Sequence, residues 1–148
     1  MRVLGIDCGE RRIGIAVSDP TGTLARPVGT IPGDPNLGLA VARVMDQLVS
    51  LEQGDEPVSL VVVGLPRRLD GSANELTSRV EAFAELLRAR AGRRVVLQDE
   101  RLTSHEADQL LALRERDWRK RKRKLDAAAA AVILQEYLDR NPTVMPEE

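Results

Sequence analysis

Three acidic residues mark places in the chain where a catalytic site could form. Asp7 ends an apolar run, Glu100 follows another, and Asp126 precedes five alanines. Clustered carboxylates repel one another unless a cation or proton intervenes, and oxygen-only ligands select Mg²⁺ or Mn²⁺. One such ion can activate water, and two about 4 Å apart can hold both oxygens of a phosphodiester displacement. We expect Asp7, Glu100 and Asp126 to be both metal ligands and catalytic residues.

Each acid also has a purely structural interpretation. Asp7 could serve a turn, Glu100 could be a surface charge near a helix start, and Asp126 could be an N-terminal helix charge. Asp7 precedes its glycine turn and faces a strand surface with little side-chain bulk, which favours function.

The remaining polar candidates are better explained by structure. Asp19 and the Asp70-Gly71 pair are typical of turns, and His105 fits the first turn of a helix. Cys8 should face away from Asp7, into the core. Trp118 could stack on a base or fix its own segment in place.

Composition limits the class of protein. The chain has 148 residues, of which 43% are hydrophobic and 30% are charged, as in a globular domain with a proper core. A single Cys and a single His exclude a disulfide framework and the usual zinc sites. No apolar run approaches a membrane span and the N-terminus does not resemble a signal peptide, so we expect a cytoplasmic location and no membrane partner.

Positive charge is concentrated in one segment. Residues 114–124, RERDWRKRKRK, hold eight basic and two acidic residues, a net charge of +6, whereas the rest of the chain carries −7. Such asymmetry predicts a surface that faces a polyanion, although a solvated helix or loop remains the simpler alternative.

The first two strands are expected to form a hairpin. A type II′ turn at Gly9-Glu10 would pair Asp7 with Arg12 and Gly5 with Gly14. The two glycines would then leave the Asp7 face open for substrate. Arg12 would orient the carboxylate or contact a phosphate.

Further elements follow from periodicity and caps. Strands are expected over residues 23–31, 58–65 and 94–100, with Pro27 favouring an edge position for the first of these. Helical spacing predicts helices over 36–51 and 125–138, and capping boxes predict helix starts at Ser72–Glu75 and Thr103–Glu106.

This order predicts an α/β fold with a mixed five-stranded sheet, in which the first three strands are antiparallel and the others parallel, and helices cover both faces. The carboxyl ends of strands one, four and five would meet at one edge, where open α/β sheets bind ligands. We expect one domain over residues 1–140 and a frayed tail over 141–148.

Basic residues near this edge are candidate nucleic-acid contacts. The loop GLPRRLDGS adds backbone N–H groups there. The candidates are Arg12, Arg67, Arg68, Arg101, Arg119, Arg121, Lys122 and Lys124.

Four motifs in order resemble the YqgF family of pre-16S rRNA nucleases: GIDCGERRIGIAVSD, VVGLPRRLDGS, DERLTSHEA and KLDAAAAAVILQEYL. The resemblance spans about residues 2–138. It implies a ribonuclease-H-like (Holliday-junction-resolvase-like) fold and a metal-dependent nuclease that matures the 5′ end of 16S rRNA in ribosome biogenesis. By position, it supports Asp7, Glu100 and Asp126 as the acidic site.

The chain departs from related resolvases at two places. It has no acid in GLPRR, where the fourth strand ends, and Ala129 stands where a second helix acid is usual. We therefore expect one tightly held Mg²⁺ or Mn²⁺ and a second ion recruited by substrate phosphate.

Three functions remain open at this point: a nuclease on structured RNA such as pre-16S rRNA, acting free or on ribosomal particles; a nuclease on branched DNA; and a non-catalytic RNA-binding ribosome-assembly factor. A phosphate-binding role for GIDCG, as in sugar kinases, would need two such domains, for which the chain is too short.

Overall fold

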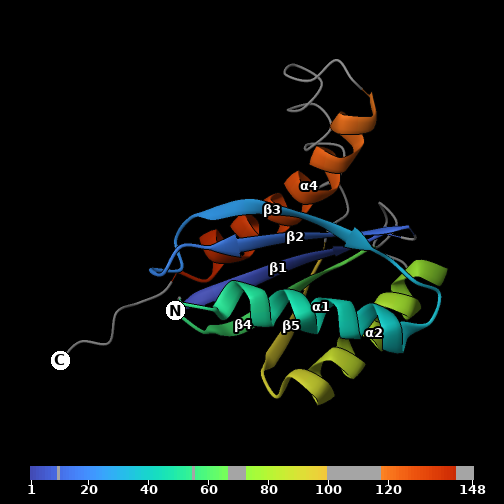
Figure 1. Ribbon diagram of the computed structural model, residues 1–148, viewed down its shortest axis with the longest axis horizontal. Coiled ribbons are helices and arrows are strands. Elements are labelled where there is room, and N and C mark those ends of the chain that lie inside the picture. Colours follow the sequence, from blue (N-terminus) through green and yellow to red (C-terminus); the bar gives the residue numbers. More distant parts are fainter. Residues whose placement is uncertain (10, 55, 67–72, 100–117, 143–148) are drawn as a thin grey trace.

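The computed structural model describes residues 1–9, 11–54, 56–66, 73–99 and 118–142, with 118–125 described by their backbone alone. Five strands and three helices lie in these ranges (Figure 1). They are β1 (Arg2–Cys8), β2 (Arg12–Ser18), β3 (Ala25–Pro32), α1 (Leu37–Glu52), β4 (Val58–Leu65), α2 (Glu75–Ala91), β5 (Arg94–Asp99) and α4 (Trp118–Arg140).

The strands form one mixed sheet in the order β3-β2-β1-β4-β5. β1 pairs antiparallel with β2, which pairs antiparallel with β3, whereas β4 and β5 run parallel to β1. The predicted topology is confirmed, including the edge position of β3 with its Pro27. The carboxyl ends of β1, β4 and β5 therefore share one edge of the sheet.

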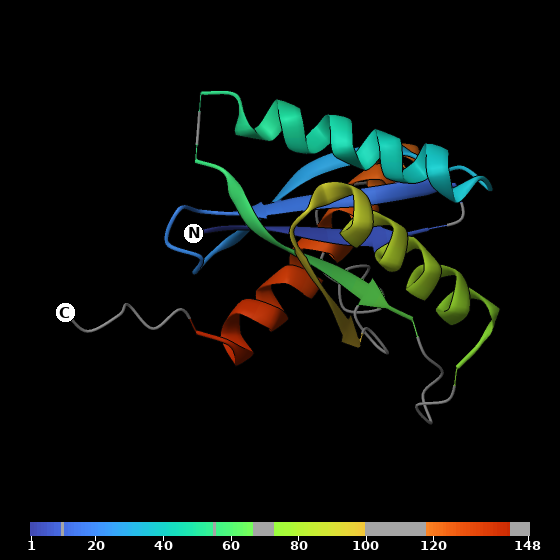
Figure 2. The same ribbon diagram turned by 90° about the horizontal axis from the view of Figure 1, so that it is seen from below.

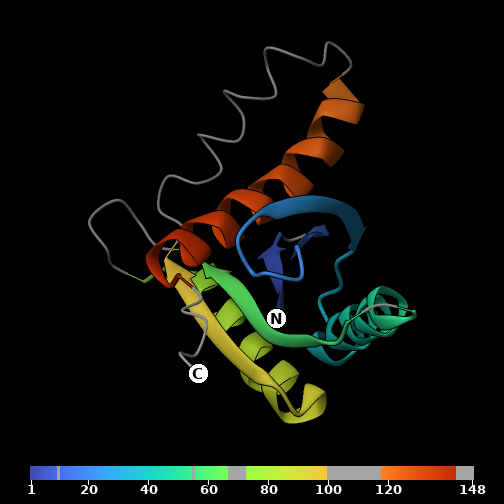
Figure 3. The same cartoon turned by 90° about the vertical axis from the view of Figure 1, so that its left-hand side faces the viewer.

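Helices cover both faces of the sheet. α1 and α2 lie on one face and α4 crosses the other (Figures 1, 2 and 3). The larger apolar cluster joins α1 and α2 to residues such as Ile6 and Ile15, and the smaller one joins α4 to Val3 and Ala16. Because side chains alternate along a strand, Asp7 belongs to the α4 face and Cys8 to the opposite face, as predicted.

The hairpin register differs from the predicted one. Asp7 opposes Gly14, Ile6 opposes Ile15, and Gly9 N–H donates to the carbonyl of Arg12 at 2.8 Å. The chain therefore turns between Gly9 and Arg12, one position later than a Gly9-Glu10 turn requires, and the predicted pairing of Asp7 with Arg12 is wrong. The partner of each β1 residue changes by two positions along β2, so every side chain stays on the same face of the sheet. The apolar pattern therefore fits either register equally well.

Helix starts and ends follow local capping chemistry. Asn36 caps α1 through its bond from Leu39 N–H, and Gly92 ends α2 in the left-handed conformation at φ 61°. The start of α2 was misplaced: its capping box is formed by Asn74 and Thr77, not by Ser72 and Glu75. Asparagine serves as an N-cap as well as serine does, so both starts fitted the sequence.

The last helix is longer than predicted. α4 begins at Trp118 rather than 125 and ends at Arg140. Asp126 therefore lies inside the helix, and the expectation that it opens the helix is wrong. Arginine and lysine are good helix formers, so the basic run continues the helix N-terminally. The helix expected from Thr103 lies outside the described residues, as does the tail beyond residue 142.

Within the described ranges, no helix is both long enough and apolar enough to span a membrane.

Candidate active site

Two of the three predicted acids come together at the carboxyl edge of β1. Asp7 lies in β1 directly opposite Gly14 of β2. A Cβ atom built on Gly14 would stand 2.0 Å from the backbone oxygen of Asp126 in α4. Paired residues on antiparallel strands have Cα atoms about 5 Å apart, so Asp126 lies over the immediate neighbour of Asp7. The structure thus brings Asp7 and Asp126 to one place from opposite ends of the chain.

The glycines beside Asp7 admit the helix rather than the substrate. A Cβ on Gly5 would lie 2.7 Å from the Cβ of Leu134 and 3.0 Å from the backbone oxygen of Ala130. The same face of α4 carries alanines, of which Ala130 is fully buried. The expectation that Gly5 and Gly14 keep this face open is therefore wrong, and the small alanine side chains of α4 help it to approach the sheet closely.

Arg12 is the partner of Asp126, not of Asp7. Its Nη1 atom lies 3.6 Å from Oδ2 of Asp126. The same Nη1 is buried and has no hydrogen-bond partner among the described residues. About a third of each side chain is exposed, 33% for Arg12 and 29% for Asp126, whereas the Nη1 atom itself is buried.

Several predicted site residues are not among those that the structure describes. Glu100, Arg67, Arg68 and Arg101 fall outside the described residues. Within the described part of the chain, no three Asp, Glu, His or Cys side chains are grouped closely enough to hold a metal ion. The other predicted contacts lie on the described backbone of α4: Arg119, Arg121, Lys122 and Lys124.

The first turns of α4 extend beyond the sheet on the side where β1 and β3 end (Figures 1 and 3). The backbone of the basic positions therefore continues the same helix that carries Asp126, away from the sheet. Lys124, the last of these positions, precedes Asp126 by two residues.

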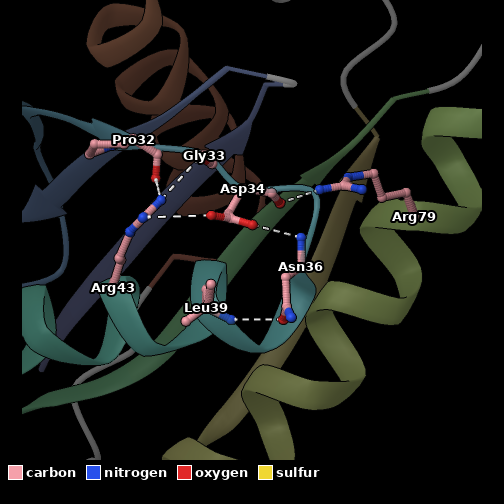
Figure 4. A network of polar contacts seen from close by, with 7 residues as sticks. All are labelled: Pro32, Gly33, Asp34, Asn36, Leu39, Arg43 and Arg79. Carbon is pink, nitrogen blue, oxygen red and sulfur yellow. Dashed lines mark hydrogen bonds and ion pairs between the residues drawn. The ribbon is translucent and has the colours of Figure 1, made fainter.

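On the other face, arginines fix the loop that joins β3 to α1 (Figure 4). Arg43 Nη1 donates to the carbonyls of Pro32 at 3.2 Å and Gly33 at 3.1 Å, and its Nη2 lies 3.6 Å from Asp34. Arg79 of α2 donates to the Asp34 carbonyl at 2.5 Å. The sequence did not predict this role for the two arginines, because an isolated arginine on a helix is usually a solvated surface charge.

A small cavity of about 20 Å³ lies beside this loop, between Cys8, Gly33, Arg79 and Phe83. It has room for about one water molecule. The cavity opens on the α1 and α2 side of the sheet, so it is separate from the site around Asp7.

The end of β4 is held to the start of α2 by a buried hydroxyl. Thr77 Oγ1 donates to the Pro66 carbonyl at 2.5 Å and accepts from Asn74 N–H at 2.9 Å. Thr77 is fully buried. These bonds fix both ends of the β4–α2 connection, which is the connection that contains Arg67 and Arg68.

Asp19 is a turn residue, as predicted. Its carboxylate accepts hydrogen bonds from Thr21 Oγ1 at 2.6 Å, Thr23 N–H at 2.8 Å and Leu24 N–H at 3.0 Å. The bond from Thr21, with those from the two backbone N–H groups, lowers the pKa of Asp19 from 3.8 to about 2.

Comparison with known proteins shows the family of this chain. The family model RuvX, described as Holliday junction resolvase, matches residues 1–140. This chain belongs to the RuvX family. Relatives in this family that carry the name "Putative pre-16S rRNA nuclease" include proteins of Listeria monocytogenes, 39% identical over 94% of this chain and 98% of the relative, and of Salinibacter ruber, 42% identical over 94% and 93%.

Solved structures show the same fold. RuvC of T. thermophilus in complex with a Holliday junction substrate has a TM-score of 0.59 at 20% identity, over 99% of both chains. The fowlpox virus Holliday junction resolvase has a TM-score of 0.57 at 14% identity, over 95% of this chain and 99% of its own. The ribonuclease-H-like fold expected from the four motifs is confirmed.

Proposed function

We propose that this chain is a metal-dependent nuclease that hydrolyses phosphodiester bonds in structured RNA, with the 5′ end of pre-16S rRNA as its substrate in the cytoplasm. The observation that carries the proposal is the meeting of Asp7 and Asp126 at the carboxyl edge of β1, beside the basic N-terminal turns of α4. Family membership and the names of the relatives support nuclease chemistry and the RNA substrate.

The donor set fits a hard divalent cation. Asp7 and Asp126 supply carboxylate oxygens at one place, and Glu100, directly after β5, is the proposed third ligand. Since β5 runs parallel to β1, its carboxyl end lies on the same edge of the sheet. Oxygen donors of this kind select Mg²⁺ or Mn²⁺. When bound, such an ion supplies Lewis acidity for phosphodiester hydrolysis.

The basic residues would hold the substrate. Phosphate contacts fix position and register on a nucleic acid without reading its sequence. We assign this role to Arg12 beside the acids, to Arg101 after Glu100, and to two groups on neighbouring segments. These groups are Arg67 and Arg68 after β4, and Arg119, Arg121, Lys122 and Lys124 on α4.

Branched DNA is the second candidate substrate, because the similar RuvC structure holds a Holliday junction. A pre-16S rRNA fragment and a four-way DNA junction, cleaved side by side at matched salt, separate the two. We expect faster cleavage of the RNA. Faster cleavage of the junction would reverse the substrate assignment and leave the nuclease assignment intact.

The chemistry is tested with the acidic variants. Asp7→Asn, Glu100→Gln and Asp126→Asn should each abolish cleavage while RNA binding survives, and EDTA should abolish cleavage by the wild type. Wild-type cleavage that persists in EDTA would overturn the metal-dependent mechanism. Unchanged precursor processing in cells that carry only Asp7→Asn would favour a non-catalytic assembly factor.

A further inference from the structure

The ion pair between Arg12 and Asp126 has an unusual form for a structural salt bridge. Its closest approach, Nη1 to Oδ2, is 3.6 Å, and this Nη1 makes no hydrogen bond to the described residues. Both side chains are partly exposed. Pairs of this kind contribute little to stability, so structure alone gives weak reason to place an arginine here.

Electrostatics gives a stronger reason. Asp126 lies over the strand neighbour of Asp7, and two carboxylates at one place raise each other's energy unless a cation is close. Arg12 begins β2 on the same face as Gly14, two residues away, and its guanidinium carries a positive charge. Arg12 is therefore a cation that the fold itself supplies to this pair of acids.

We propose that Arg12 is the resident counter-ion of Asp126, which a divalent cation displaces when it binds there. The inference rests on the proposed metal site and gives Arg12 a positioning role at that site. Since coupling between two binding events is reciprocal, a cation on Asp126 weakens its contact with Arg12. The released guanidinium is then free to bind a substrate phosphate, so metal binding prepares the site for nucleic acid.

Direct measurement of Mn²⁺ binding tests this competition without any cleavage assay. The amplitude of the free Mn²⁺ signal in electron paramagnetic resonance reports the dissociation constant for the full chain. Arg12→Gln should bind Mn²⁺ about fivefold more tightly than the wild type, which corresponds to about 1 kcal/mol. Arg12→Lys, which keeps the charge, should stay within about twofold of the wild type.

Arg11→Gln is the matched control. Arg11 is the exposed neighbour of Arg12 in the same hairpin, so its replacement removes the same charge without touching the ion pair. We expect its Mn²⁺ affinity to change less than about twofold. If Arg11→Gln and Arg12→Gln tighten binding equally, the effect is one of net charge, and the proposal is overturned.

The Asp126→Asn background completes the test. There, Arg12→Gln should no longer tighten the residual Mn²⁺ binding, because the partner of Arg12 is gone. If the single variant Arg12→Gln binds Mn²⁺ as tightly as the wild type or more weakly, the proposal is overturned, whereas the proposed metal site is not. Absence of Mn²⁺ binding by the wild type would instead overturn the metal site itself. Arg12→Met preserves the alkyl packing and replaces Arg12→Gln if circular dichroism shows the latter to be unfolded.

Discussion

The backbone oxygen of Asp126 lies 2.0 Å from the position that a Cβ atom on Gly14 would occupy. Real Cβ atoms do not approach other heavy atoms so closely, so only glycine admits the helix at this point. The contact involves backbone rather than a flexible side chain, and it fixes where α4 lies on β2. Asp126 can therefore lie beside Asp7 because Gly14 has no side chain.

Gly14→Ala should destabilise the protein by about 3 kcal/mol, because a methyl group forced into a packed contact displaces backbone. It should also lower cleavage activity at temperatures where the variant is folded, since α4 carries Asp126. Urea unfolding and single-turnover cleavage measure the two effects.

Gly38→Ala is the control for the loss of a glycine. Gly38 lies in α1, where alanine is the better helix former, and its new Cβ would lie 3.1 Å from Asn36 Oδ1. Its stability should remain within about 1 kcal/mol of the wild type and its activity unchanged. Similar losses in both variants would contradict a specific role for the Gly14 contact.

Thr77→Val should cost about 2 kcal/mol, because it leaves the Pro66 carbonyl and the Asn74 N–H without the hydroxyl that serves both. Valine keeps the shape of threonine, so the loss reports the hydrogen bonds. Thr77→Ser keeps the hydroxyl and should lose about 1 kcal/mol through its missing methyl group. Chemical denaturation ranks the three proteins, and a serine variant less stable than the valine variant would refute this account.

Asp19 should titrate with a pKa of about 2, measured by NMR of its carboxyl carbon. Because the folded pKa is lower than the ordinary value of 3.8, the stabilising effect of the charged carboxylate is complete above pH 3.8 and is lost as the pH falls through about 2. Thr21→Val removes the largest cause of the shift and should move the pKa back toward 3.8. An unchanged pKa in that variant would assign the shift to the backbone N–H groups instead.

The basic turns of α4 should contribute to RNA affinity through phosphate contacts. Replacement of both Lys122 and Lys124 by alanine should reduce the slope of log affinity against log salt concentration by about 2. Arg140→Ala, at the opposite end of the same helix, should leave the slope unchanged. A fluorescence anisotropy titration at several salt concentrations compares the variants, and equal slopes for all of them would exclude this helix from the interface.

The sequence was sufficient for the features that periodicity and volume determine. The continuous apolar run over 58–65 gave β4 its bounds, and Pro27 gave β3 its edge position. The position of Asp7 at the carboxyl edge followed from the order and direction of the strands.

The errors arose where two arrangements satisfy the same pattern. A turn shifted by one residue keeps every apolar side chain on its own face, so the sequence did not distinguish Arg12 opposite Asp7 from Gly14 opposite Asp7. The hydrogen bond from Gly9 N–H to the Arg12 carbonyl distinguishes the two registers. The start of α4 was missed because charged residues outside the core leave no apolar stripe to mark a helix.

The continuity of α4 fixes a length as well as a position. With a rise of about 1.5 Å per residue, the backbones of Lys124 and Arg119 lie about 3 and 10 Å from Asp126 along one axis. The helix thus sets a fixed distance between the basic residues proposed to bind the nucleic acid and the proposed point of cleavage. One alanine inserted between Lys124 and Leu125 would rotate the basic residues by about 100° around the helix axis and lengthen the helix before Asp126 by one residue. The position of cleavage on a uniform substrate should then shift.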